Sequence, residues 1–519
     1  MSRPSSLRTG ALALALLVAA SLALLPATVQ SQAGPRKIVL LHTSDYHSHA
    51  VPKYAEGEQH MGGLARVLQY LRDEKQANPD MTVVLSGGDT MNLGTPAWSD
   101  KYQCAEWAMF NGLQDAMAFG NHEADYGWAR FEECKAGVTY PILAANLLGA
   151  DGAPLLTGWT VIERGGVRLG LFALAGSDFE KLVKPADRPE GAKFVDGDTM
   201  APEIIRHLRE VEKVDAVVLI GHRLYEEDLK LAQTVPGIDV ILGTHSHRKE
   251  DLKQIPGTNT WIISPYQYFN YVSRLELTFD GGKLAGVGGG LVRMGSDRPE
   301  APDIAEKVQA MQRDLEADPK YAARFEKLGT AAVELSDANL SSGESVLGNW
   351  VQDTVRAAAR AQVALSTASS FRAAIPPGPV TVEDYLTAVP YKNLVLVHEI
   401  TGAQVQQLLD LSVSRRGSDS FSQASGVRYT IRDGKAADVQ ILAAPTDTPT
   451  DLAAFVPLDP AATYLVATTD FQARIAGGYS DLFKQAASVT DTGIIVNDLM
   501  METLRTADSV GAALDGRVK

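Results

Sequence analysis

Side chains that bind metal ions gather in five short stretches of this sequence, each directly after an apolar run. The five stretches are LLHTSDYH, VLSGGDT, AFGNHEADYG, VLIGHR and ILGTHSH. The first of them and the two residues after it place three histidines and one aspartate within eight residues, 42–49, although the chain has only 10 histidines among 519 residues. This local density indicates a metal-binding or catalytic site.

Seven residues in these stretches have side chains that suit a pair of divalent ions: Asp45, His47, Asp89, Asn121, His222, His245 and His247. Asp45 and His47 are two residues apart, so both side chains can point the same way from an extended segment. Asp89 follows two glycines, which allow a tight turn that presents its carboxylate. A mixed set of oxygen and nitrogen ligands favours zinc or manganese, with iron also possible. With one shared carboxylate and open positions for water, such a pair is typical of hydrolytic enzymes.

The apolar runs before these stretches predict strands of a buried sheet. From residue 37 to about 280, such runs alternate with amphipathic segments such as GGLARVLQYLRDEKQ and APEIIRHLREVEK, which have helical spacing. This alternation predicts an α/β layered domain. Because ligands bind at the carboxyl ends of strands in open α/β sheets, the five stretches are expected to converge on one site.

A polar break at residues 295–303, GSDRPEAPD, ends this first region. Apolar residues at helical spacing then predict a linking helix over 303–328. A second domain is expected from about residue 331, with a helix in LGNWVQDTVRAAARA and strands in NLVLVHEI, 427–432 and 464–468. Thr401 and Gln404 form a capping-box pattern that predicts a helix start.

Residues 1–33 have the pattern of a secretory signal peptide. Two arginines precede the apolar run ALALALLVAASLALLP, and the small-residue stretch TVQSQA follows, with Ala33 as the expected last residue removed. The alternative is an uncleaved anchor, for which the run is short. Export would place the protein in the periplasm or outside the cell. In that oxidising compartment Cys104 and Cys134 either form a disulfide or remain as two buried thiols.

The chain is acidic, with a formal net charge of −15 that becomes −17 when the two arginines of residues 1–33 are removed. Nucleic-acid binding needs neutralisation of phosphates, so this charge argues against a nucleic-acid partner. After signal removal no membrane span is expected. A site for an anionic substrate must therefore be made locally positive by metals or by a few arginines.

In their order and spacing, the five stretches resemble the calcineurin-like binuclear metallophosphoesterases. With the second domain, the chain resembles the secreted bacterial family of 5′-nucleotidases, UDP-sugar hydrolases and 2′,3′-cyclic phosphodiesterases. The resemblance implies a calcineurin-like β-sandwich flanked by helices, then a linking helix and a smaller α/β domain. The expected division is a signal peptide (1–33), a metallophosphoesterase catalytic domain (35–297), a linking helix (298–330) and a 5′-nucleotidase-like C-terminal substrate-binding domain (331–519).

The same resemblance implies roles for individual residues. Asp45, His47 and His247 would hold one metal, Asn121, His222 and His245 the other, and Asp89 would bridge them; His122 and Asp125 would be the catalytic dyad. The two metals would lower the pKa of a bound water, and protonated His122 would stabilise charge on the phosphoryl oxygens. Asp125 would orient His122 and keep it cationic, or alternatively would only be an acid at a helix N-terminus.

Three further polar residues lie in or beside the same stretches. His42, inside the end of its strand, is expected to pack beneath the site or support it. Glu123 is expected to be structural. His49 lies just past the ligands and is not expected to contact substrate, although contact with substrate is the less favoured alternative.

The second domain carries four residues that resemble the family's substrate-binding loops: Arg372 in TASSFR, Tyr391 and Asn393 in PYKN, and Phe471 in DFQARIAGGYSDLF. Tyr391 and Phe471 would stack on a base, Tyr391 replacing the usual phenylalanine but keeping the π-face; domain packing is the alternative. The loop after Phe471 is longer than usual, and Tyr479 replaces its aspartate. The stretch just before LGN, ELSDANLSSGESV, contains no arginine, whereas the bacterial nucleotidases of this family tend to have two there. Arg474 is a candidate replacement.

These observations favour a secreted metal-dependent phosphohydrolase that acts on nucleotides or related small phosphoesters. The first alternative is a thiosulfohydrolase-like enzyme of sulfur oxidation, which would use a similar metal pair on a carrier-bound sulfur group. The second alternative is an inactive metal-containing binding protein. The complete ligand set and intact dyad argue against the second alternative.

Overall fold

The computed structural model describes residues 35–447 and 454–519. The predicted signal peptide, residues 1–33, lies outside the described residues. Among the residues that are described, no helix is both long enough and apolar enough to cross a membrane.

The first domain is a sandwich of two six-stranded sheets. The first sheet has the order β16 (Lys283–Arg293), β15 (Tyr271–Asp280), β1 (Arg36–Thr43), β4 (Thr82–Ser86), β5 (Ala116–Ala118) and β6 (Ile142–Leu143). The second has the order β13 (Lys249–Gln254), β14 (Trp261–Pro265), β12 (Val240–Gly243), β11 (Ala216–His222), β9 (Val167–Ala175) and β8 (Trp159–Arg164). Leu40 and Val83 of the first sheet pack with Leu171 and Val218 of the second in one buried cluster. Strands covered on both faces read as continuous apolar runs, which explains the pattern in the sequence.

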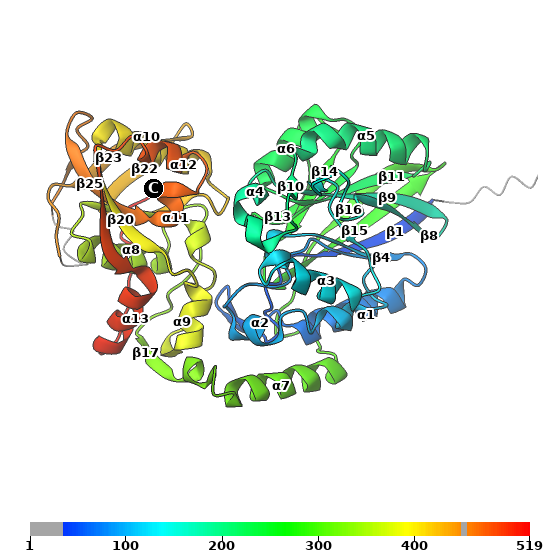
Figure 1. The fold of residues 1–519 in the computed structure, drawn as a ribbon, viewed down its shortest axis with the longest axis horizontal. Coiled ribbons are helices and arrows are strands. Elements are labelled where there is room, and N and C mark those ends of the chain that lie inside the picture. The colour runs from blue at the N-terminus through cyan, green and yellow to red at the C-terminus, as the bar shows by residue number, and fades with distance from the viewer. Residues whose placement is uncertain (1–34, 448–453) are drawn as a thin grey trace, which may run out of the picture.

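Helices cover the outer face of each sheet. On the first sheet lie α1 (Leu64–Ala77) and α3 (Trp128–Ala136), and on the second lie α5 (Gly197–Glu210) and α6 (Tyr225–Thr234). Figure 1 shows α5 and α6 on one side of the sandwich and α1 and α3 on the other. The predicted alternation of strands and helices therefore corresponds to a layered α/β domain.

The helix α7 (Pro302–Ala317) links the domains and lies beneath the first domain in Figure 1. It is shorter than the predicted helix over 303–328. Asp318 has an extended backbone (ψ 120°) because Pro319 follows it, and the residue before a proline disfavours the helical region. A short 3₁₀ turn (Ala322–Phe325) and the strand β17 (Lys327–Ala331) follow.

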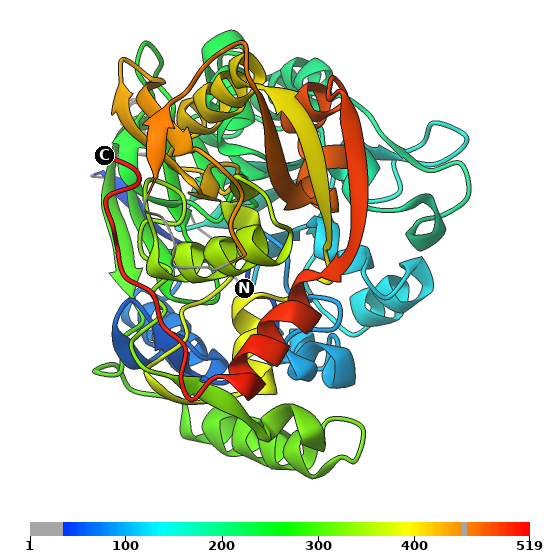
Figure 2. The same ribbon diagram turned by 90° about the vertical axis from the view of Figure 1, so that its left-hand side faces the viewer.

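The second domain is built on a five-stranded sheet with the order β21 (Ser422–Ser425), β18 (Val363–Thr367), β25 (Thr463–Thr469), β20 (Leu394–Thr401) and β26 (Ser488–Ile495). Figure 2 faces this domain and shows β25, β20 and β26 side by side. Around the sheet lie α8 (Val346–Ala358), α9 (Val382–Ala388), α10 (Gly402–Ser414) and α13 (Val496–Thr506). A three-stranded sheet of β22 (Val427–Arg432), β23 (Lys435–Leu442) and β24 (Phe455–Pro457) completes it.

One local prediction is confirmed in these domains, and one open alternative is decided. The Thr401 side chain accepts a hydrogen bond from the Gln404 backbone, and the Gln404 side chain accepts one from the Thr401 backbone, so the capping box starts α10. Cys104 and Cys134 form a disulfide with a Cα–Cα distance of 5.8 Å, so the thiol alternative is not what the structure shows. The predicted architecture of a helix-flanked sandwich, a linking helix and a smaller α/β domain is confirmed as well.

Candidate active site

The five ligand-bearing stretches all lie at the carboxyl ends of strands. Asp45 and His47 follow β1, Asp89 follows β4, and Asn121 follows β5, three strands that pair in parallel in the first sheet. His222 ends β11, and His245 and His247 follow β12, which is parallel to β11 in the second sheet. The strand ends of both layers therefore face one site, as predicted from the rule for α/β sheets.

Five of the seven candidate ligands have left-handed backbone conformations. The φ angles are 50° for Asp45, 48° for His47, 51° for Asp89, 59° for His245 and 46° for His247. Such conformations are costly for residues other than glycine and persist only where the surrounding structure enforces them. Here the first two stretches interlock, because the backbone N–H groups of Asp45 and His47 donate to the carbonyls of Gly88 (3.0 Å) and Asp89 (2.9 Å). This strain is typical of functional positions.

Two groups of candidate ligands lie side by side. In the first, His247 Nε2 lies 3.4 Å from Asp45 Oδ1 and 3.0 Å from His47 Nε2. In the second, His222 Nε2 lies 3.1 Å from Asp89 Oδ2, and His245 completes the cluster. Asp89 Oδ2 is also 3.9 Å from His47 Nε2, so the Asp89 carboxylate lies between the two groups.

The donor atoms of these groups fit metal ions. Two nitrogens bound to one ion at about 2.1 Å and at a right angle lie about 3.0 Å apart, which is the spacing between His47 and His247. His47 Nδ1 lies 3.2 Å from the Met91 carbonyl and His222 Nδ1 lies 2.5 Å from the Gly87 carbonyl, so each Nε2 keeps its lone pair for the cluster. Asn121 Oδ1 and His222 Nε2 are buried without a hydrogen bond. Burying a polar atom without a partner costs free energy, and a bound metal ion would give both atoms a partner.

Asp178, which was not predicted from the sequence, supports His245. Asp178 Oδ2 lies 3.0 Å from His245 Nε2, which leaves Nδ1 of the same ring to face the cluster. A carboxylate that holds the far nitrogen of a ligand histidine fixes the tautomer and orientation of the ring. The available signal was the position of Asp178 just after β9, another strand whose carboxyl end faces the site.

Glu123 is structural, and it holds Asp89 in place. Its carboxylate accepts hydrogen bonds from the backbone of Asp89 (2.9 Å), Thr90 (2.7 Å) and Gly120 (2.6 Å), and from the Thr90 hydroxyl (2.7 Å). The side chain is fully buried. Glu123 therefore links the turns that carry Asp89 and Asn121.

His122 and Asp125 form a hydrogen-bonded pair beside the cluster. His122 Nδ1 lies 2.7 Å from Asp125 Oδ2, which also accepts a hydrogen bond from the Leu93 backbone (2.7 Å). The His122 backbone donates to Asp89 Oδ1 (2.9 Å). Burial lowers the pKa of His122, but the charges of Asp125 and Asp89 outweigh burial and raise the pKa to about 10. The imidazole is therefore cationic at neutral pH, with Nε2 available to donate.

His42, in the first stretch, and His49, just beyond it, pack around the site. His42 is fully buried and makes no hydrogen bond, and burial lowers its pKa to about 3, so it is a neutral packing residue. His49 stacks on Tyr268 with ring centroids 3.8 Å apart, and its Nδ1 lies 2.9 Å from the His47 carbonyl. His49 thus supports the turn that carries His47.

Arg372 brings the second domain to the candidate metal cluster. Its Nη1 lies 2.7 Å from His247 Nδ1, and its Nε donates to the Tyr391 hydroxyl at 3.1 Å. A cleft of about 640 Å³ between the domains is lined by His247 and Arg372 together with Arg248, Lys249 and Asp419. Its size suits a small organic phosphoester. Acidic side chains line the cleft as well, so the positive charge beside the cluster comes from Arg372 and not from the cleft as a whole.

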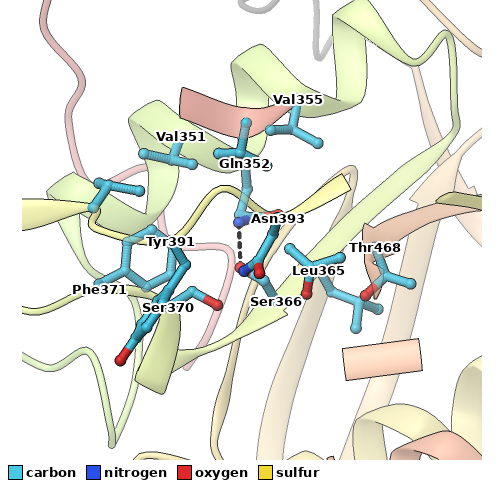
Figure 3. Close-up of a pocket in the computed structure, with 13 residues that line it drawn as sticks. Val351, Gln352, Val355, Leu365, Ser366, Ser370, Phe371, Tyr391, Asn393 and Thr468 are labelled. Atoms are coloured by element: carbon cyan, nitrogen blue, oxygen red, sulfur yellow. Dashed lines mark hydrogen bonds between the residues drawn. The ribbon is translucent and has the colours of Figure 1, made fainter. Parts of the chain in front are cut away.

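Tyr391 and Asn393 also line a second, much smaller cavity, of about 10 Å³, within the second domain (Figure 3). Phe371, not Phe471, is the aromatic residue beside Tyr391 there. Phe471 is half-buried in α11 (Asp470–Arg474). The structure therefore places Arg372 and Tyr391 together, whereas base stacking by Phe471 stays a prediction.

The departures in the lengthened loop have a structural explanation at one position. Tyr479, which replaces the usual aspartate, is fully buried, and its hydroxyl donates to the Ser420 carbonyl (2.8 Å). Tyr479 is a core residue of the second domain. Arg474 is exposed at the end of α11.

Sequence profiles of two protein families match this chain. The calcineurin-like phosphoesterase profile matches residues 38–249, and the 5′-nucleotidase C-terminal domain profile matches residues 327–485. The first match contains all seven candidate ligands and the dyad. The second contains the four candidate substrate-binding residues.

Curated relatives are similar along most of the chain. Protein UshA of Escherichia coli (strain K12) is 25% identical, over 93% of this chain and 93% of its own length. The trifunctional nucleotide phosphoesterase protein YfkN of Bacillus subtilis (strain 168) is 23% identical over 93% of this chain, which spans only 35% of the length of YfkN.

Solved structures show the same two-domain fold. The 5′-nucleotidase precursor of Thermus thermophilus superposes with a TM-score of 0.73 and 27% identity, over 93% of this chain and 99% of that one. The sulfate thiohydrolase SoxB of Thermus thermophilus superposes with a TM-score of 0.70 and 20% identity, over 93% of this chain and 96% of that one. The similarity to SoxB shows a shared fold.

Proposed function

This chain belongs to the calcineurin-like phosphoesterases that carry a 5′-nucleotidase C-terminal domain, and from that premise we propose that it hydrolyses 5′-nucleotides at a pair of divalent metal ions. Membership makes it a metal-dependent phosphoric ester hydrolase. The observation that carries the proposal is the shared position of Asp89. Its carboxylate lies between two groups of ligand side chains and accepts a hydrogen bond from the backbone of His122.

The ligand assignment follows the two groups. Asp45, His47 and His247 would hold one ion, Asn121, His222 and His245 would hold the other, and Asp89 would be shared between them. Zinc and manganese are the ions that best suit these ligands, and iron suits them as well. When bound, such a pair supplies Lewis acidity at the phosphoryl group and lowers the pKa of a water molecule.

The side chains of the protein supply the remaining roles in the reaction. His122, cationic and within reach of the cluster, donates a hydrogen bond from Nε2 to a phosphoryl oxygen and stabilises the charge that develops there. Asp125 orients His122 through Nδ1. Arg372 extends the positive site from the second domain, and the cleft of about 640 Å³ accommodates the rest of the nucleotide.

A nucleotide substrate is supported by the relatives' names and by the second domain. YfkN is named a nucleotide phosphoesterase and the Thermus thermophilus neighbour a 5′-nucleotidase precursor. This chain matches the 5′-nucleotidase C-terminal domain profile over the residues that include Arg372 and Tyr391, and its similarity to both proteins covers 93% of the chain. We extend the proposal to export, because the signal-peptide pattern of residues 1–33 and the Cys104–Cys134 disulfide both suit an oxidising compartment.

Phosphate release from a substrate panel tests the proposal. Purified protein with added manganese or zinc would be given AMP, UMP, 2′,3′-cyclic AMP, UDP-glucose and bis-p-nitrophenyl phosphate. The His122→Ala variant would be run beside His207→Ala, a matched control on α5 whose ring packs on Trp159.

Turnover of AMP that is lost in His122→Ala and kept in His207→Ala would support the proposal. Turnover of the generic diester alone would keep the metal chemistry and reject nucleotides as substrates. No turnover by protein with bound metal would reject phosphoester hydrolysis of these substrates and favour the alternative of a carrier-bound sulfur group.

A further inference from the structure

The hydroxyl group of Tyr391 accepts hydrogen bonds from Arg372, whose guanidinium group also lies against His247 of the candidate metal centre. We propose that this hydroxyl donates a hydrogen bond to the anionic group of the substrate, and that Tyr391 and Arg372 together form the anion-binding element of the second domain. The inference rests on the proposed function for the location of that anionic group. It replaces the expected role of Tyr391, which was to stack on a base.

The first observation is a continuous chain of contacts from Tyr391 to the ligand cluster. Arg372 donates to the Tyr391 oxygen from both Nε (3.1 Å) and Nη2, and its remaining nitrogen, Nη1, lies 2.7 Å from His247 Nδ1. One guanidinium group therefore separates the phenol oxygen from His247. An anion that binds the metals at His247 would lie next to both side chains.

The second observation concerns the phenol proton. A guanidinium group has only donors, so the Tyr391 oxygen accepts in both contacts with Arg372. The O–H bond must then point away from Arg372, where it is free to donate. A hydroxyl held in this way by a charged group is oriented before the substrate arrives, which is the arrangement that strengthens hydrogen bonds to developing charge.

The third observation argues against stacking on the inner face of the ring. On that side Tyr391 lines the cavity of about 10 Å³ with Phe371 and Val351, which leaves room for about one water molecule and none for a base. Figure 3 shows the ring at one end of this cavity with its oxygen pointing away from Gln352. One side of the ring is thus packed within the second domain, while its oxygen lies beside Arg372, which lines the cleft between the domains.

The Tyr391→Phe substitution separates the two roles, because it keeps the ring and removes only the hydroxyl. Metal-loaded wild type and variant would be compared for the kcat and KM of AMP hydrolysis, for inhibition by inorganic phosphate, and for phosphate affinity by calorimetry. Tyr464→Phe is the matched control. It removes a hydroxyl group from β25 of the same domain, and this hydroxyl accepts a hydrogen bond from the Asp459 backbone. Thermal melting and metal content would establish that both variants fold and load metal.

We expect Tyr391→Phe to lower kcat by roughly 10- to 100-fold and to weaken phosphate binding by a similar factor, with Tyr464→Phe unchanged. Unchanged kcat and phosphate affinity in Tyr391→Phe would overturn the inference and restore the stacking role. If wild type hydrolyses no phosphoester, the proposed function fails, but the calorimetric comparison still decides the role of Tyr391. Wild type that neither hydrolyses esters nor binds phosphate would overturn both.

Discussion

His245 Nε2 lies 3.0 Å from Asp178 Oδ2, so the nitrogen that this histidine offers to a metal is Nδ1. Two other histidines of the cluster, His47 and His222, offer Nε2 because their Nδ1 atoms contact backbone carbonyls. The far nitrogen of each of these three rings is thus occupied by a protein acceptor, whereas His247 Nδ1 lies 2.7 Å from Arg372 Nη1. The structure orients these ligands before any ion binds, which lowers the entropic cost of forming the site.

Asp178→Asn is expected to weaken metal binding. The amide keeps the shape of the side chain but no longer offers a charged acceptor to His245, and loss of such a partner typically costs about 10- to 100-fold in metal affinity. Titration of the metal-free protein with manganese or zinc would measure the change. Asp297→Asn, at an exposed position, is the control. Equal affinities in the two variants would show that Asp178 does not support the site.

Asp125→Asn is expected to lower kcat by about 100-fold while leaving metal content unchanged. The amide oxygen of the new side chain could still accept the hydrogen bond from the Leu93 backbone, so the loop should stay in place. What is lost is the charge that keeps His122 cationic and oriented. Steady-state kinetics with metal analysis on the same samples would test this. If the variant keeps the kcat of wild type, Asp125 has no catalytic role and is only an acidic residue near a helix N-terminus.

The buried carboxyl group of Glu106 is expected to make the stability of the protein depend on pH. Its buried carboxyl accepts from Trp98 Nε1 (2.9 Å) and the Tyr46 hydroxyl (3.2 Å), and burial raises its pKa from 4.5 to about 7. The folded state therefore holds a proton that the unfolded state releases between pH 4.5 and 7, so stability falls as pH rises through this window. The loss is on the order of 3 kcal/mol.

Glu106→Gln removes this titration. Melting temperatures of wild type and variant between about pH 4.5 and 8 would measure it, and the variant should lose less stability across that range. Parallel curves for the two proteins would show that Glu106 is not the group responsible.

Removal of the disulfide by Cys104→Ser and Cys134→Ser together is expected to destabilise the protein by about 3–4 kcal/mol, because the bridge closes a segment of 30 residues in the unfolded chain. Denaturant unfolding would measure the difference. The control is wild type under reducing conditions, which should match the double variant. Equal stability of oxidised and reduced wild type would contradict the prediction.

Much of the candidate site could be predicted because its residues stand next to strands in the sequence. Asp45, Asp89 and His222 each follow or end an apolar run, and strands of one parallel layer end at the same edge. Local pattern and chain topology together then imply convergence. The capping box of Thr401 could be predicted for the same reason, since its partners are three residues apart.

Asp178 could not be selected in this way, because it is one acidic residue after a strand, among 63 aspartates and glutamates in the chain. Only the packing of β9 beside β11 brings it to His245. The end of α7 at Ala317 also differs from the prediction. Apolar spacing continued past this point, but the proline that follows Asp318 decided the backbone conformation.

The sequence by itself determined the α/β class, the two-domain order, and the residue types and spacing of the candidate metal site, because each of these depends on neighbours along the chain. Only the tertiary structure decided which nitrogen His245 offers, and that Arg372 of the second domain contacts His247 of the first. It also decided that the Tyr391 hydroxyl lies beside Arg372 and that its ring lines a small cavity of the second domain. The contacts behind the first two features join residues 67 and 125 positions apart, and their distances are set by the packing of sheets and domains and not by local pattern.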